Sequence, residues 1–247
     1  RQLKKRKMNV VTNVEILPNS IQIIEGEGIT VNGIVNGKTE TFQGEKLLLS
    51  VGRVPNIEGI GIENTNIEIK NGVIVTNDFY QTKESHIYAI GDCIGGMQLA
   101  HVASKEGIIA VEHMAGKTPE KLDYTSVPRC IYSFPEVASV GLTEKEAIDK
   151  GYEIKIGKFP FRANGKALVF GESDGFVKMI ACKDTNDLLG VHLIGPKVTE
   201  LIAESSLAKL LDAIPWEISE SIHPHPSLSE TIGEAALAVD GKAIHFS

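Results

Sequence analysis

The octapeptide at 223–230, His-Pro-His-Pro-Ser-Leu-Ser-Glu, constrains the fold more than any other stretch of this 247-residue chain. Pro226 fixes its own φ and disfavours the α region for His225, which predicts that the imidazole sits on a stiff turn. Glu230 follows five residues after His225. A histidine on rigid backbone beside a carboxylate is a candidate general acid–base, because the carboxylate can fix its tautomer and favour the imidazolium.

Ser227 and Glu230 also fit a capping box, S-x-x-E, which predicts a helix over 228–239. This gives the carboxylate a second interpretation. Glu230 could serve only to cap backbone N–H groups, with His225 as an ordinary surface residue of the turn. The spacing by itself leaves both interpretations open.

Composition narrows the class of protein. Hydrophobic residues make up 42% of the chain and charged residues 23%, as in ordinary globular proteins, and the length of 247 residues predicts two domains. The net charge of −7 argues against nucleic acid as the main partner and fits a cytoplasmic protein. We expect no membrane span, because no run of about eighteen apolar residues occurs.

The three cysteines are far apart and form no C-x-x-C motif. We therefore expect neither a metal site nor a local redox disulfide. An odd number of cysteines suits a reducing compartment. They are Cys93, Cys130 and Cys182.

The first part of the chain is predicted to form strands. Short β-like runs occur at 21–24, 29–35 and 40–42. Asn36-Gly37 between two of them is a strong signal for a two-residue hairpin. The continuous apolar run 46–51 predicts a strand that is buried on both faces.

The next part predicts a strand, a glycine-rich turn and a helix. A turn at Asn71-Gly72 precedes a strand at 73–75, and 87–90 is predicted as a second buried strand that stops at Gly91-Asp92. A helix is predicted over 99–114. This order is typical of an α/β nucleotide site. The apolar residues expected on the helix are Val102, Ala103, Ile108, Val111 and Met114.

A polar linker at 117–123 separates these elements from a second type of pattern. A capping box at Thr143 predicts a short helix that ends near Gly151. An amphipathic helix is predicted over 198–211. We expect an α+β domain with helices packed on one face of an antiparallel sheet. Its predicted strands are 153–159, 175–181 and 188–194.

Two loops are candidate ligand sites. Asp92 at a strand end can accept hydrogen bonds from a sugar or polyol hydroxyl, and the helix start at 98–100 offers free N–H groups. A plain Asx turn is the alternative, although Thr82 and the pattern after it favour a ligand. Gly52 permits close approach of a ligand, and Arg53 could pair with a phosphate or with a neighbouring carboxylate. No Gly-x-Gly-x-x-Gly motif occurs.

Four segments taken together resemble the C-terminal half of a flavin-dependent disulfide reductase. The family is that of the pyridine nucleotide-disulfide oxidoreductases, and the closest resemblance is to its dihydrolipoamide dehydrogenase (dihydrolipoyl dehydrogenase) branch. Each segment alone is weak, but their order and spacing cover nearly the whole chain. The segments are 50–56, 82–92 continuing into 98–101, 127–141 and 223–230.

The resemblance implies a layout of three parts. Residues 1–55 correspond to the C-terminal part of an NAD-binding domain, and residues 56–123 to a central segment that completes the FAD site. Residues 124–247 correspond to the dimerisation, or interface, domain. The expected fold class is thus α/β remnants of nucleotide-binding domains followed by an α+β domain.

The resemblance also implies roles for individual residues. Gly52 would contact NAD, and Asp92 would bind the ribityl or phosphate region of the flavin. His225 would be the acid–base residue with Glu230 as its orienting partner, and the His225–Pro226 bond is expected to be cis. Ser227 stands where Thr is commoner, and Gln98 where an apolar residue is usual. The residues expected to line the flavin, mostly through backbone, are Gln98, Leu99, Ala100 and His101.

The implied reaction is dihydrolipoamide + NAD⁺ to lipoamide + NADH in a homodimer. His225 of one subunit would serve the redox disulfide of the other, and the partner would be the lipoyl-transferase core of a 2-oxo-acid dehydrogenase complex. In the family, the redox cysteine pair and both Gly-rich loops lie N-terminal to the position of Arg1, so we expect this chain alone to be inactive. A glutathione-reductase type of enzyme and a non-catalytic dimerisation or docking module are the alternatives.

Overall fold

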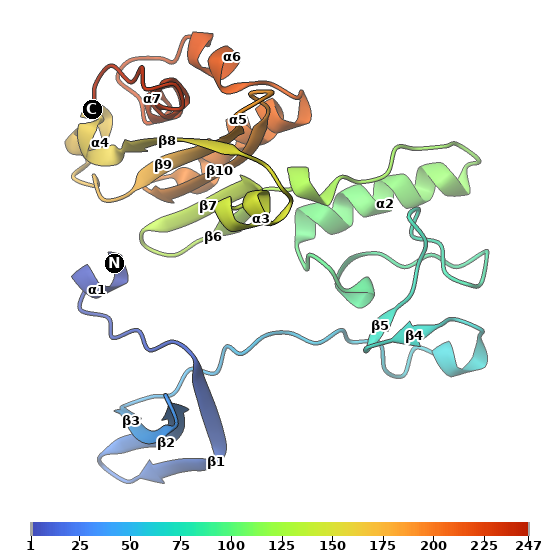
Figure 1. Cartoon of the computed structure of the whole chain (residues 1–247). Coiled ribbons are helices and arrows are strands. Elements are labelled where there is room, and N and C mark those ends of the chain that lie inside the picture. Colours follow the sequence, from blue (N-terminus) through green and yellow to red (C-terminus); the bar gives the residue numbers. More distant parts are fainter. Residues whose placement is uncertain (1, 247) are drawn as a thin grey trace. The chain divides into compact units, whose positions relative to one another are not determined.

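The computed structural model describes residues 2–246, which divide into two compact units, Arg1–Asn56 and Ile57–Ser247. The first unit begins with the short helix α1 (Gln2–Lys5) and continues into three strands. These form an antiparallel sheet in the order β1-β2-β3 (Figure 1). The strands are β1 (Val14–Ile24), β2 (Gly28–Val35) and β3 (Lys38–Gly44).

The predicted hairpin at Asn36-Gly37 is confirmed. Both residues have positive φ, 51° and 77°, as a two-residue type I′ turn requires. Val35 and Lys38 close the ladder on either side. The three predicted strands are therefore present, although β1 begins earlier than its apolar residues indicated.

The prediction of a buried strand at 46–51 is wrong. The segment forms no strand, and its apolar side chains are open to solvent, with Leu48 89% and Val51 82% exposed. A strand buried on both faces needs hydrogen-bonded neighbours and covering layers. None of the residues that the structure describes pairs with this segment.

The second unit begins with small elements. A 3-10 turn at Ile62–Asn64 precedes the two-stranded sheet of β4 (Ile69–Lys70) and β5 (Val73–Ile74), which turns at Asn71-Gly72 as predicted. The predicted strand at 87–90 is absent. The chain is extended there but makes only an isolated bridge between Gln81 and Tyr88, because no neighbouring strand in the described part of the chain extends the ladder.

Helix α2 (Ala100–Met114) confirms the predicted helix, but only part of the expected apolar set is buried. Its buried residues include Val102 and Ile109, whereas Ile108, Val111 and Met114 are exposed. Ile109 packs in a small core with Tyr80. The apolar side chains of α2 lie on two sides of the helix, so hydrophobicity alone did not identify the side that packs.

A five-stranded antiparallel sheet forms the centre of the second unit, in the order β6-β7-β10-β9-β8. Three of its strands were predicted. The two short strands at the β6 edge were not, because they are interrupted by a turn through the cis bond Phe134–Pro135. The strands are β6 (Arg129–Ile131), β7 (Glu136–Gly141), β8 (Ile154–Pro160), β9 (Phe176–Cys182) and β10 (Leu188–Gly195).

The longer helices pack on one face of this sheet, as predicted. Alternate residues of β9 separate the two faces: Val177 and Met179 join the core beneath α5 and α7, while Ile180 points to the other side. There it meets Ala147 of α3, which begins at the predicted capping box. The helices are α3 (Glu144–Asp149), α4 (Gly165–Phe170), α5 (Val198–Leu210), α6 (Pro215–Glu220) and α7 (Glu230–Ala238).

A helix that crosses a bilayer must be long and predominantly apolar, and this requirement can be applied to the helices of residues 2–246. None of them meets that requirement.

Candidate functional site

The His225 imidazole and the Glu230 carboxylate lie side by side, as the sequence predicted. His225 stands on the segment between α6 and α7, and its bond to Pro226 is cis. Its Nδ1 is 2.8 Å from Oε1 of Glu230. The His225 side chain is 78% exposed, so the other ring nitrogen can be reached from solvent.

Glu230 uses both carboxylate oxygens. Its Oε2 accepts a hydrogen bond of 2.8 Å from the Ser227 N–H, which is one half of a capping box. The other half is absent, because the Ser227 hydroxyl contacts the Ser229 hydroxyl at 2.8 Å instead. Helix α7 consequently begins at Glu230 with Ser229 as its N-cap, which corrects the predicted start at Leu228. The two interpretations of Glu230 are thus compatible.

These contacts keep the Glu230 carboxyl group ionised. Burial raises the pKa of Glu230, but the hydrogen bonds from the Ser227 N–H and from His225 outweigh it, so the pKa lies below its usual value. Glu230 is therefore a carboxylate at neutral pH and accepts the Nδ1–H of His225. In the tautomer that donates from Nδ1, Nε2 is unprotonated and available as a base.

A second histidine–carboxylate pair supports the same segment. His223 Nε2 is 2.7 Å from Glu204 Oε1 on α5. The His223 side chain is only 10% exposed. The hydrogen bond to Glu204 raises the pKa of His223 despite this burial. The His-x-His repeat in the sequence drew attention to His223, but it did not identify Glu204 as the partner of His223.

Asn164 holds the other end of the segment. Its Nδ2 donates to the Ser227 carbonyl at 2.9 Å, while its Oδ1 accepts from the Ala167 N–H and caps α4. Asn164 is 4% exposed. An Asn just before a short helix signals a cap, but nothing local points to a residue 63 positions away.

The Asp92 loop forms a separate candidate site. Asp92 lies in the 3-10 turn Gly91–Ile94 and is exposed. The Gly91 N–H donates to Oε2 of Glu106 at 2.7 Å, and the other oxygen of Glu106 accepts from the Tyr124 hydroxyl at 2.8 Å. Glu106, which the sequence analysis missed, is 2% exposed and so ties the loop to α2. The signal for Glu106 in the sequence was an acidic residue among the apolar residues on the buried side of a predicted helix.

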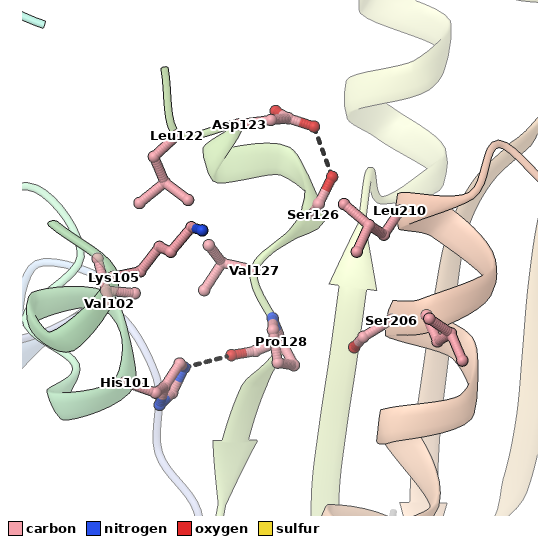
Figure 2. A pocket seen from close by; sticks show the side chains of 11 residues that line it. His101, Val102, Lys105, Leu122, Asp123, Ser126, Val127, Pro128, Ser206 and Leu210 are labelled. Carbon is pink, nitrogen blue, oxygen red and sulfur yellow. Dashed lines mark hydrogen bonds between the residues drawn. The ribbon is translucent and has the colours of Figure 1, made fainter. Parts of the chain in front are cut away.

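The N-terminus of α2 is uncapped by any side chain. Leu99 is the N-cap residue and has extended backbone, so the first N–H groups of the helix point toward a possible electronegative ligand. The imidazole of His101 is directed elsewhere, since its Nε2 lies 3.0 Å from the Pro128 carbonyl (Figure 2). Any contact of this stretch with a ligand is thus expected through backbone. Gln98 and Leu99 are half-buried, and Ala100 and His101 are exposed.

A cavity of about 300 Å³ lies beside His101 (Figure 2). Its walls come from α2, from the stretch before β6 and from α5, and they are mainly apolar, as at Leu122 and Leu207. Lys105 is also directed into it. No sequence motif predicts this cavity, because its walls come from three elements far apart in the chain.

Gly52 belongs to the first unit, is exposed, and has a φ of 127° with open space where a Cβ would stand. Within the second unit, α2 and α7 are well apart, so the Asp92 loop and the His225 pair are two places in one chain (Figure 1). Among the described residues no group of His, Cys, Asp and Glu could hold a metal ion.

Comparison with known protein families gives two matches. Residues 1–107 match the model described as pyridine nucleotide-disulphide oxidoreductase. Residues 127–236 match the dimerisation domain of the same description. Together the two models cover most of the chain.

Individual relatives agree with these matches. The chain is 62% identical over 244 residues to the dihydrolipoyl dehydrogenase of Bacillus subtilis, which covers 99% of this chain and 51% of that protein. It is 44% identical to the mitochondrial dihydrolipoyl dehydrogenase of Caenorhabditis elegans, covering 99% of this chain and 50% of that protein. The chain thus spans about half the length of the curated relatives it matches.

Solved structures show the same fold. The crystal structure of LpdA from Mycobacterium tuberculosis matches with a TM-score of 0.83 and 28% identity, covering 95% of this chain and 50% of that chain. The flavoprotein disulfide reductase RclA from Escherichia coli matches with a TM-score of 0.83 at 23% identity, covering 94% of this chain and 52% of that chain, a likeness of fold alone.

Proposed function

Because this chain belongs to the pyridine nucleotide-disulphide oxidoreductase family, we propose that it is the acid–base and interface half of a dihydrolipoyl dehydrogenase. The proposed overall reaction is dihydrolipoamide + NAD⁺ to lipoamide + NADH + H⁺. The observation that carries the proposal is the 2.8 Å contact between His225 and Glu230 in a chain 62% identical to a dihydrolipoyl dehydrogenase.

In this proposal His225 accepts a proton at its Nε2 atom. Its exposed Nε2 accepts the proton of a dihydrolipoyl thiol, and the resulting thiolate is the nucleophile that attacks a disulfide. The imidazolium formed is stabilised by the Glu230 carboxylate at Nδ1. Glu230 also keeps the ring in the tautomer that leaves Nε2 free, so its role is to orient the base.

The residues near Asp92 fit FAD, the cofactor of this family. The uncapped N-terminus of α2 offers N–H groups to electronegative atoms, and Gly91, with a φ of 73°, allows the sharp turn that presents Asp92. When bound, FAD accepts the electrons of the dithiol and passes them to NAD as hydride. Asp92 would accept hydrogen bonds from flavin hydroxyl groups. The residues proposed to line it through backbone are Gln98, Leu99, Ala100 and His101.

Gly52 fits a contact with NAD, because a glycine lets a ligand approach the backbone closely. Its exposed backbone and the open space at its Cβ position let a nucleotide approach the main chain closely. We retain the proposed parts of the chain as residues 1–55 for the NAD-binding portion, 56–123 for the FAD-completing segment and 124–247 for the interface domain.

The proposed assembly is a homodimer through residues 124–247. The match to a dimerisation domain supports it, as does the separation of α7 from α2, which suits a histidine that serves the partner's disulfide. The proposed further partner is the lipoyl-transferase core of a 2-oxo-acid dehydrogenase complex, in the cytoplasm.

A chimera tests this proposal. The N-terminal half of the Bacillus subtilis enzyme, joined to this chain, should bind FAD and form NADH from dihydrolipoamide and NAD⁺. His225→Ala in the chimera should retain FAD but lose turnover. A yellow, dimeric chimera with no dihydrolipoamide activity would reject the proposed substrate, and activity with oxidised glutathione instead would indicate the glutathione-reductase type. A colourless dimer would favour a non-catalytic dimerisation module.

A further inference from the structure

We propose that His223 and Asn164 are positioning residues that hold the His225 segment from both ends. The clamp consists of two contacts, His223 with Glu204 before His225 and Asn164 with Ser227 after it. The inference rests on the proposed function for its catalytic meaning. The geometry of the clamp concerns this chain alone.

The need for a clamp follows from the exposure of His225. Most of its side chain is in solvent, and among the described residues its ring has Glu230 as its hydrogen-bond partner. One exposed hydrogen bond contributes only about 1 kcal/mol net, too little to hold a loop in a single position. The positional precision of His225 must therefore come from the backbone on either side.

The first contact anchors the chain two residues before His225. His223 is nearly buried, and its bond to Glu204 connects the segment to α5. Pro224 lies between the two histidines and restricts the backbone that transmits this anchoring. A displacement of His223 would thus be carried directly to His225.

Helix α7 has a glycine where the His223 ring rests. A Cβ at Gly233 would stand 2.9 Å from Nδ1 of His223 and 3.1 Å from its Cε1. The ring therefore lies against the helix backbone itself. Since α7 also carries Glu230, this contact places both histidines relative to one helix.

The second contact anchors the chain two residues after His225. Asn164 donates to the Ser227 carbonyl, while Glu230 accepts from the Ser227 N–H. Ser227 is thus held through both of its backbone polar groups. Because the same Asn164 side chain caps α4, the position of α4 and that of the segment are linked.

Two variants each remove one contact of the clamp. His223→Phe keeps a ring on Gly233 but deletes the bond to Glu204, which is exposed enough to be solvated. Asn164→Asp keeps the oxygen that caps α4 and deletes the donor to Ser227. His245→Phe is the matched control, because the same kind of substitution breaks another histidine–carboxylate pair of α7, the 2.7 Å contact with Glu234, and leaves the clamp intact.

The readout is NMR of the full chain labelled with ¹⁵N. In the wild type, the ¹⁵N shifts of the His225 ring should show one tautomer, with the proton on Nδ1. In His223→Phe and in Asn164→Asp they should show a mixture of tautomers. The Ser227 amide should exchange with solvent faster by roughly fivefold in each variant. His245→Phe should leave both signals unchanged.

Folded His223→Phe and Asn164→Asp proteins with wild-type His225 tautomer and Ser227 exchange would overturn the proposal. If His223→Phe does not fold, Asn164→Asp and Glu204→Gln decide the question, the latter with a milder effect because an acceptor remains.

Turnover in the chimera separates this inference from the proposed function. Each clamp variant should lower kcat by up to roughly 10²-fold with KM nearly unchanged, because the base is displaced while the substrate site is intact. An inactive wild-type chimera would reject the proposed function, whereas the NMR measurements on the chain would still decide the clamp.

Discussion

Gly157 in β8 approaches α7 so closely that a Cβ on it would stand 2.1 Å from the carbonyl oxygen of Ala235. The same Cβ would lie 2.5 Å from the Val239 nitrogen. Both are backbone atoms, which cannot turn aside as a side chain can. The close contact between strand and helix, and with it the placement of Glu230 on α7, therefore requires glycine at this position.

We expect Gly157→Ala to destabilise the protein by roughly 1–3 kcal/mol or more, because the added methyl group overpacks the contact between β8 and α7. Urea unfolding followed by circular dichroism measures this. Gly165→Ala is the control. Gly165 opens α4 with nothing within 4 Å of its Cβ position, so alanine there should be neutral or stabilising by up to about 1 kcal/mol. Equal stabilities of the two variants would contradict the argument.

Glu106→Ala should destabilise the second unit strongly. It leaves the buried Gly91 N–H without its acceptor, which costs roughly 1–3 kcal/mol, and it also removes the acceptor of the exposed Tyr124 hydroxyl. Tyr124→Phe removes only one of the two contacts and should cost less. Thermal unfolding of the wild type, Glu106→Ala and Tyr124→Phe proteins measures their order of stability. A Glu106→Ala protein as stable as wild type would show that Glu106 does not secure the Asp92 loop.

His223 should make stability depend on pH near neutrality. The hydrogen bond to Glu204 raises its pKa above the ordinary value of 6.5. A raised pKa in the folded state means that this stabilisation is complete below the unfolded pKa and is lost as pH rises through the folded pKa. The stability lost in His223→Phe should therefore be larger at pH 5.5 than at pH 9, measured by urea unfolding at both values. A difference that grows with pH would refute the assignment.

Glu230 should act in the opposite direction and at lower pH. Burial raises its pKa, but the hydrogen bonds from the Ser227 N–H and from His225 bring it below the ordinary value of 4.5. Its stabilisation is present above the unfolded pKa and is lost as pH falls through the folded pKa. Glu230→Gln should therefore lose less stability than wild type between pH 5 and pH 3. The free energy of unfolding, measured by urea unfolding, should be plotted against pH for both proteins. Parallel plots for the two proteins would indicate that Glu230 is not held by these contacts.

The sequence by itself determined the features that depend on neighbouring residues. The positive φ values of the hairpin at Asn36-Gly37, the capping box at Thr143 and the His225–Glu230 contact all join residues at most five positions apart. Backbone sterics and short hydrogen bonds decide such features, so a local pattern predicts them. The strands β8, β9 and β10 were likewise predicted, each to within one residue of its ends.

Only the tertiary structure decided which surfaces and distant groups meet. It buried Ile109 rather than Ile108 of α2, and it left 46–51 exposed, since burial depends on what packs against a segment and not on its own hydrophobicity. It also brought Glu204 to His223, and Asn164 to Ser227 across 63 positions. Partners of this kind are chosen by the packing of whole helices on the sheet, and that information is distributed over the chain rather than contained in any motif.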